Sequence, residues 1–121
     1  MPLTKEIGDR GEELAARLLT QKGYTVLDRN VRSRYGEIDI ICADHEYIVF
    51  VEVKTRGAKR LGSPGEAVDF VKRRKFVTTV KIYLAKTRDS RQPRFDVVEV
   101  FLETAPPKIR HIENAFDLSR K

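Results

Sequence analysis

Two acidic residues and a lysine interrupt segments of the sequence that are otherwise apolar. Asp39 lies within GEIDII (36–41), and Glu52 and Lys54 lie within YIVFVEVK (47–54). A strand that is buried on both faces reads as nearly continuous Val, Ile and Phe, and an unpaired carboxylate is costly to bury. The lysine can neutralise only one of the two acids, so a surplus negative charge remains to be balanced.

A divalent cation would balance this surplus charge. Mg²⁺ prefers oxygen ligands, typically one or two carboxylates, with water and a substrate phosphate completing its shell. Asp39 and Glu52 would bind Mg²⁺ (or Mn²⁺), and the backbone carbonyl of Val53 would supply another oxygen. Lys54 would contact the phosphate or lower the pKa of the attacking water. The plain alternative is a solvated Glu52–Lys54 pair near a strand end, with Asp39 on the surface.

The two acids meet only if their strands pair in one particular register. A two-residue or four-residue loop within 44–47 sets Asp39 directly opposite Glu52, with Cβ atoms roughly 4.5 to 5.5 Å apart. A slip by one residue would put the two acids on opposite faces of the sheet. Strict alternation along the strand also predicts that Glu37, Asp39 and Ile41 share one face.

The chain around this hairpin predicts the elements that position it. Residues 4–22 have one apolar helical face, and Gly23 is placed to end that helix. The small residues Gly8, Gly11 and Ala15 would let this face lie close against a sheet. Strands are expected at 24–30, twice within 36–56, at 94–102 and, as a short edge strand, at 108–114.

A second helix is expected over about 64–86, where SPGE (63–66) provides a capping box and a proline at the first helical position. Its inward-facing residues would be Phe76, Val80, Tyr83 and Leu84. The order α-β-β-β-α-β-β predicts an α/β fold in which helices pack on a mixed sheet. At 121 residues the chain suits a single domain, 1–121.

Charge is distributed unevenly along the chain. The formal net charge is +6, but residues 54–94 carry 13 Lys and Arg against three acidic residues. A basic half of this kind suggests a polyanion footprint, because Lys and Arg neutralise nucleic-acid phosphates. A solvated basic face is the alternative explanation.

Other function classes receive little support from the sequence. No apolar run approaches the roughly 20 residues of a bilayer span, and the charged start lacks the apolar centre of a secretory signal. A single cysteine, Cys42, excludes an internal disulfide and fits a reducing, cytoplasmic setting. His45 and His111 have no partner at zinc spacing, and the Gly-rich loop after residue 56 lacks a nucleotide-binding pattern.

The motif formed by these residues resembles a known superfamily. GEIDII followed by FVEVKTR is similar to the PD-(D/E)xK nucleases, with Asp39 as the first acid, Glu52-Val53-Lys54 as the ExK, and Ile38 where the superfamily name has proline. More specifically, the chain resembles the largely uncharacterised bacterial YraN family through the segments GDRGEELAARLL, GYTVLDRNVRSRYGEIDII, VFVEVKTR, GSPGEAV and HIENAF.

The resemblance implies a restriction-endonuclease-like three-layer α/β/α core with a central mixed β-sheet. It also implies a metal-dependent endonuclease acting on DNA, related to Holliday junction resolvases and, by that analogy, a homodimer. Glu12 matches an acid on the first helix of such enzymes, bound to metal directly or through water; the alternative is a solvent-exposed helix acid. Glu37 is either an acid just outside the metal ligands or a solvated strand-end residue.

Candidate nucleic-acid contacts lie before and after the acidic strands. They are Arg32, Arg34, Arg56, Lys59 and Arg60. The basic run 72–75 covers too much of a helix circumference to face one way, so only part of it can contact nucleic acid. A catalytically silent nucleic-acid-binding module and an interaction protein that retains the fold remain the alternatives to a nuclease.

Overall fold

The computed structural model describes residues 2–56 and 70–115, with side chains over 5–56 and 73–115. The expected contacts Lys59 and Arg60 and the expected helix start at 63–66 lie outside the described residues. The elements, in chain order, are α1 (Pro2–Gln21), β1 (Thr25–Ser33), β2 (Gly36–Ala43), β3 (Tyr47–Arg56), α2 (Phe70–Thr87), β4 (Gln92–Phe101) and β5 (Lys108–Ile112).

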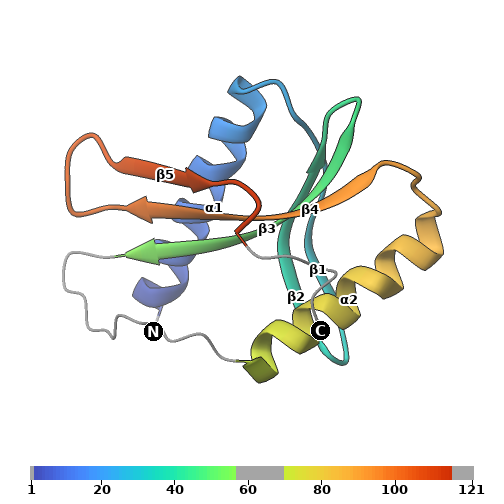
Figure 1. Cartoon of the computed structure of the whole chain (residues 1–121). Helices are drawn as coiled ribbons and strands as arrows, with labels where there is room; N and C mark the ends of the chain where they lie inside the picture. The colour runs from blue at the N-terminus through green and yellow to red at the C-terminus, as the bar shows by residue number, and fades with distance from the viewer. Residues whose placement is uncertain (1, 57–69, 116–121) are drawn as a thin grey trace.

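The five strands form one mixed sheet in the order β1-β2-β3-β4-β5 (Figure 1). Adjacent strands are antiparallel except for β3 and β4, which are parallel. A parallel pair needs a crossover connection, and α2 lies in the connection between β3 and β4. The expected element order and the mixed sheet are therefore confirmed.

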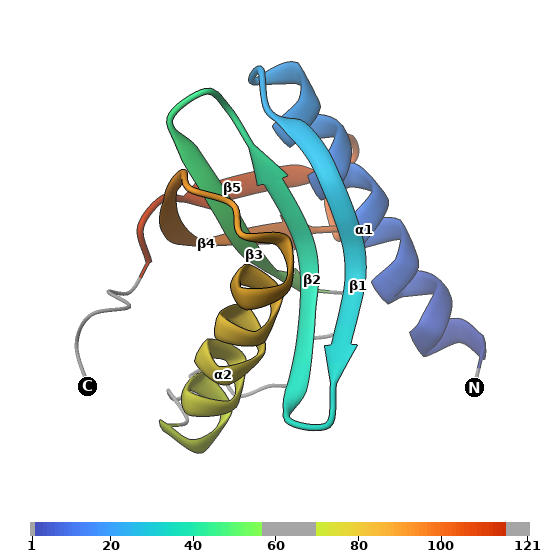
Figure 2. The ribbon, with the colours of Figure 1, turned by 90° about the vertical axis from the view of Figure 1, so that its right-hand side faces the viewer.

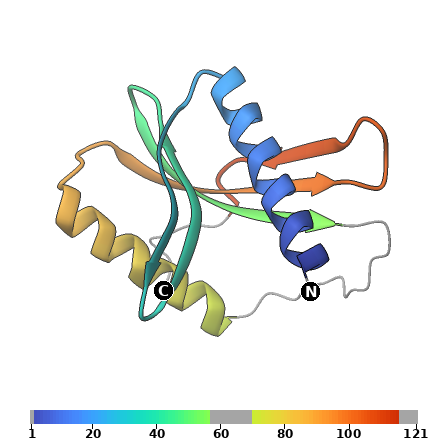
Figure 3. The ribbon, with the colours of Figure 1, turned by 180° about the vertical axis from the view of Figure 1, so that it is seen from behind.

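The two helices cover opposite faces of the sheet. Figure 2 shows the strands between α1 on one side and α2 on the other, and Figure 3 shows α1 lying across the face that is hidden in Figure 1. This is the restriction-endonuclease-like α/β/α arrangement that the sequence predicts. In the described ranges, neither helix combines the length and the apolar character that a bilayer span requires.

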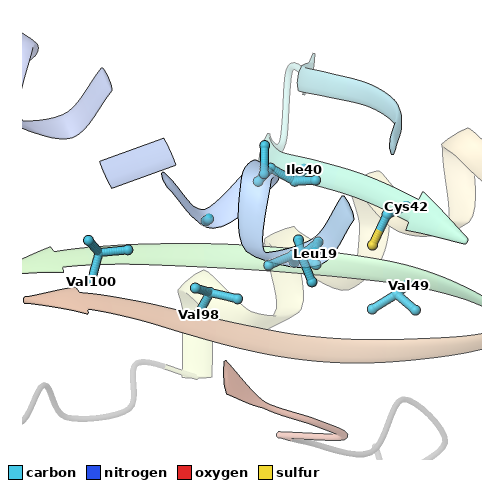
Figure 4. Close-up of a cluster of buried hydrophobic side chains, with 9 residues drawn as sticks. Leu19, Ile40, Cys42, Val49, Val98 and Val100 are labelled. Atoms are coloured by element: carbon cyan, nitrogen blue, oxygen red, sulfur yellow. The ribbon is translucent and has the colours of Figure 1, made fainter. Parts of the chain in front are cut away.

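Each helix packs on one face of the sheet and buries an apolar cluster there. On the α1 side Leu19 packs with strand residues that include Ile40, Val51 and Val98, and Cys42 is a buried member of the same cluster (Figure 4). On the α2 side the cluster is rich in aromatic rings, and Phe50, Phe76 and Phe95 meet edge to face. Val80, Tyr83 and Leu84 complete this second cluster, as expected from the helical spacing. The apolar residues of β3 thus alternate between the two clusters, so this strand contributes to the core on both faces of the sheet.

Gly11 allows α1 to lie directly on β3. A Cβ atom added to Gly11 would fall 2.9 Å from the Cβ of Thr55 and closer still to its hydroxyl group. The expected close approach is thus confirmed at Gly11 and at the fully buried Ala15. It is wrong at Gly8, where an added Cβ would have nothing within 4 Å. Gly11 precedes Glu12, so the close contact also sets how near that acid comes to the sheet.

Candidate active site

The candidate site begins where the β2–β3 ladder ends. The paired residues run from Ala43↔Ile48 to Ile40↔Val51, which is the register expected from the loop length. One position further on, the side chain of Asp39 bonds to β3 instead: its Oδ2 accepts a hydrogen bond of 2.8 Å from the backbone N–H of Val53. Asp39 is therefore attached to the backbone between Glu52 and Lys54, so the expected proximity of the first acid and the ExK segment is confirmed.

At this point the side chains of β1 and β2 stop alternating regularly between the two faces of the sheet. Val31 and Ile38, which are paired, pack on the α2 side. The next pair is Arg29 and Ile40, of which Arg29 reaches the acids of α1 and Ile40 belongs to the α1-side cluster. Between them Asn30 adopts the left-handed conformation, with φ of 53°, a region in which Asn is several-fold enriched among non-glycine residues.

This change of face corrects one expectation. Ile38 and Ile41 both pack in the α2-side cluster, so strict alternation does not hold through this part of β2. Glu37, Asp39 and Ile41 therefore do not share a face. Alternation assumes a regular strand, and the left-handed residue on the neighbouring β1 strand marks the place where regularity is lost.

Asp39 lies in an environment that disfavours its negative charge. Burial raises the pKa of Asp39 to about 6, against the opposing effect of the Val53 hydrogen bond. The nearby carboxylates of Glu37, Glu52 and Glu12 raise the pKa further. Burial and like charges are two of the general causes of such a shift. Because the carboxyl group is buried among like charges, binding of a proton or a cation to it is electrostatically favourable.

Glu12 faces the sheet from α1. Its side chain is only 12% exposed, which differs from the solvent-exposed helix acid considered as an alternative. Arg29 Nη2 lies 3.4 Å from Glu12 Oε1. The Asn30 amide is oriented from its hydrogen-bond network, and its nitrogen donates to Glu12 Oε2 at 3.0 Å and to Glu37 Oε2 at 3.3 Å. Asn30 thus links the helix acid to the strand acid.

The sequence patterns did not single out Arg29 or Asn30. Both lie in a stretch that reads as an ordinary strand, and their partners on α1 are 16 to 18 residues away in the chain. The only local signal is the residue type of Asn30, because Asn is the non-glycine residue that most readily adopts a left-handed turn. That signal does not reveal which acids the side chain bonds.

Glu52 and Lys54 follow Ile48 and Phe50 along β3. Because side chains alternate and Phe50 packs with α2, these two residues project toward the α2 side, and both are half-buried. In the described ranges, no three His, Cys, Asp or Glu side chains converge closely enough to hold a metal ion. Glu12 from the α1 side and Glu52 from the α2 side both lie near enough to Asp39 to raise its pKa, but the three acids are not arranged as three direct ligands.

The expected nucleic-acid contacts within the described residues lie at the β1–β2 turn and at the end of β3. Arg32 and Arg34 lie at the exposed β1–β2 turn, where Arg32 Nε is 3.5 Å from Glu37 Oε2 and the Arg34 guanidinium lies over the Tyr35 ring. Arg56 ends β3, and its Nη2 lies 3.3 Å from Glu99 Oε2. Within the basic run 72–75, residues 74 and 75 are exposed.

A second polar cluster is centred on a fully buried carboxylate and was not foreseen. The carboxylate of Asp96 on β4 accepts two hydrogen bonds from Arg94, at 2.9 and 2.8 Å, one from His111 Nε2 at 2.7 Å, and one from the backbone of Asn114 at 3.0 Å. Burial alone would raise the pKa of Asp96, but the bonds from His111 and Arg94 outweigh it and hold the pKa at about 2. This cluster fastens the chain after β5 to the sheet.

Comparison with known proteins gives the relationship of the chain. Residues 11–100 match the model of a family described as "Uncharacterised protein family UPF0102". A UPF0102 protein of Caldanaerobacter subterraneus subsp. tengcongensis is 45% identical over 116 residues, covering 93% of this chain and 95% of that protein. A UPF0102 protein of Syntrophomonas wolfei is 47% identical over 115 residues, covering 94% and 100%.

A third relative, from Symbiobacterium thermophilum, is 47% identical over 118 residues, covering 94% of this chain and 98% of that protein. The matched span contains Glu12, Asp39, Glu52 and Lys54, and the family is YraN-like, which confirms the resemblance drawn from the sequence. The chain belongs to the uncharacterised protein family UPF0102.

Proposed function

We propose that this protein is a metal-dependent endonuclease that hydrolyses phosphodiester bonds in DNA, with branched or otherwise structured DNA as its substrate. The observation that carries the proposal is the environment of Asp39. Its carboxyl group is bonded to the backbone of the ExK segment, and its pKa is raised by burial and by three neighbouring acids. A site with unbalanced carboxylates beside a lysine is suited to a divalent cation and a phosphate.

The donor set fits Mg²⁺ or Mn²⁺, because the charged groups around Asp39 are carboxylates, which these hard cations prefer. Asp39 and Glu52 would hold the ion, with the carbonyl of Val53 beside them and Glu12 acting through water. When bound, the ion would polarise the phosphate and stabilise the charge that develops during its hydrolysis. The like charges that raise the pKa of Asp39 would at the same time be neutralised.

The residues of the chain have separate tasks in this proposal. Lys54 would place its ammonium group against the phosphate or the attacking water and stabilise negative charge as it forms. The Val53 hydrogen bond keeps Asp39 in place, and Asn30 keeps Glu12 and Glu37 next to each other. Arg32 and Arg34 at the β1–β2 turn and Arg56 at the end of β3 would bind the DNA backbone.

The experiment is a cleavage assay with Mg²⁺ or Mn²⁺ on duplex, single-stranded, flapped and four-way-junction DNA. Wild type, Asp39→Ala and Lys54→Ala are purified identically, so that a contaminating nuclease would appear in all three. We expect cleavage by wild type that both variants lose by at least about a hundredfold, the scale on which removing one charge-stabilising group acts. Equal behaviour of the three proteins would refute the proposal. Binding without cleavage in any metal would favour a nucleic-acid-binding module instead.

A further inference from the structure

Three charged residues form a row across neighbouring strands on the α2 side of the sheet. Lys54 on β3 is paired with Glu99 on β4, and Glu99 is paired with Arg110 on β5. Paired residues in neighbouring strands project to the same side. The row therefore begins at the lysine of the candidate active site and leads away from it to the edge strand β5.

Glu99 lies between two arginines. Arg56 Nη2 is 3.3 Å from Glu99 Oε2, and Arg110 Nη1 is 3.6 Å from Glu99 Oε1. The Glu99 side chain is 15% exposed, whereas the side chains of Arg56 and Arg110 are 30% and 68% exposed. The carboxylate is thus buried beneath two guanidinium groups that reach the solvent.

The charges of this cluster do not cancel. One carboxylate faces two guanidinium groups, and Lys54 adds a further positive charge beside it. Glu99 Oε1 is buried and has no hydrogen-bond partner within the described part of the chain, so the contact with Arg110 is an ion pair without a close bond. Guanidinium groups have five donors in a planar fork that matches phosphate oxygens. Donors that Glu99 leaves unused are available to an anion from the solvent.

We propose that Arg56 and Arg110 form a binding site for a backbone phosphate of the DNA, and that Glu99 is the positioning residue that holds both guanidinium groups in place. The inference rests on the proposed nuclease function and deepens it. The row places this phosphate on the β5 side of Lys54, next to the phosphate that is hydrolysed. DNA held there lies across the ends of β3 and β4 and is aligned with Asp39 and Glu52.

The test is DNA binding without metal, so that it does not depend on cleavage. Fluorescence anisotropy with labelled duplex and four-way-junction DNA, in EDTA, gives Kd over a series of KCl concentrations. For Arg56→Ala combined with Arg110→Ala we expect Kd to rise about tenfold and the salt slope to fall by about 1, because the one lost phosphate contact removes about 0.9 from the slope on duplex DNA. Arg17→Ala, at an exposed arginine of α1 that pairs with Glu13, is the matched control and should bind as wild type does.

The variant Glu99→Gln separates positioning from simple charge. It makes the protein more positive by one unit, so a role of Glu99 that is only electrostatic predicts tighter binding. Positioning predicts that Kd rises several-fold, because the amide no longer holds the two guanidinium groups. Urea unfolding of each variant shows that it is folded under the assay conditions. Tighter or unchanged binding by folded Glu99→Gln would overturn the positioning role.

The remaining outcomes also decide the inference. A double arginine variant that binds as tightly as wild type, with the same salt slope, would overturn the phosphate site even if wild type cleaves DNA. Loss of binding in the variants of a wild type that never cleaves would support the site and refute the nuclease. Inorganic phosphate is included as a competitor. If low millimolar phosphate displaces DNA from wild type but not from the double variant, the ligand of the site is a free anion and not the DNA backbone.

Discussion

Replacing Gly11 by alanine should destabilise the protein, whereas the same replacement at Gly8, three residues earlier in α1, should stabilise it. Both residues are in the helix, so both variants gain about 1 kcal/mol from the better helix propensity of alanine. Only at Gly11 does the added methyl group meet an obstacle, because it would lie 2.9 Å from the Cβ of Thr55. Overpacking of this kind costs about 1 to 3 kcal/mol.

The difference between the two variants isolates the packing effect, because the propensity gain is common to both. We expect Gly8→Ala to raise the unfolding free energy by up to about 1 kcal/mol and Gly11→Ala to lower it by about 0 to 2 kcal/mol. Urea unfolding monitored by circular dichroism gives both values, and Tm should differ by about 4 °C for each kcal/mol of difference.

Equal stability of the two variants would refute the close packing of α1 on β3. The companion variant Thr55→Ala in the Gly11→Ala background removes the hydroxyl and methyl groups of Thr55, which are the two closest groups, and should recover part of the loss. A shift of α1 would also move Glu12, so Gly11→Ala should reduce any metal-dependent activity while Gly8→Ala should not.

Further predictions concern the buried charges and the left-handed residue. The pKa of Asp39 in the folded protein is about 6, above its ordinary value of 3.8, so the folded state binds the proton more tightly and stability falls as pH rises from about 4 to 6. In metal-free buffer the free energy of unfolding of Asp39→Asn should therefore exceed that of wild type by at most about 3 kcal/mol at pH 8 and match it near pH 4. Urea unfolding at the two pH values measures this difference, and a difference that does not change with pH would contradict the prediction. Asp96 affects stability in the opposite direction: its pKa of about 2 gives stability that is present above pH 4 and lost as pH falls toward 2. Asp96→Ala should lower the free energy of unfolding by about 3 to 5 kcal/mol at pH 7, because Arg94 is left buried without its partner. A loss below about 1 kcal/mol would show that the network contributes little to stability. Asn30→Gly should keep the left-handed turn and lose only the amide bonds, while Asn30→Ala should also pay about 1 kcal/mol of backbone strain; thermal unfolding of the pair tests this, and equal Tm values would count against a strained turn.

The fold could be predicted from the sequence because each local pattern agreed with the whole. The hairpin loop length set the β2–β3 register, and the helical spacing of Phe76 and Val80 identified the buried side of α2. These features depend on residues that are close in the chain or that repeat with a simple period.

The candidate site could be predicted only in part. Asp39 and the ExK segment could be found because charges stand out within apolar strands. The change of face at Asn30 could not, because it depends on a single backbone angle that the residue type permits but does not require. Asp96 was missed because Arg94 and His111, its partners, fit an alternating strand equally well as surface residues. Glu99 was missed for the same reason, since its neighbours Lys54 and Arg110 come from different strands.

The central claim is that Asp39 and Glu52 bind a divalent cation, and titration of the purified protein with Mn²⁺ in a calorimeter at pH 7.5 tests it most directly. Asp39→Asn and Glu52→Gln are measured beside wild type, and Glu46→Gln, an exposed acid of the β2–β3 turn, serves as the matched control. We predict a Mn²⁺ site in wild type and in Glu46→Gln that both site variants lose, and binding to wild type that weakens as pH falls below about 6, because the protonated carboxyl group of Asp39 cannot bind the ion. Absence of binding in wild type, or binding that survives in Asp39→Asn and Glu52→Gln, would contradict the account.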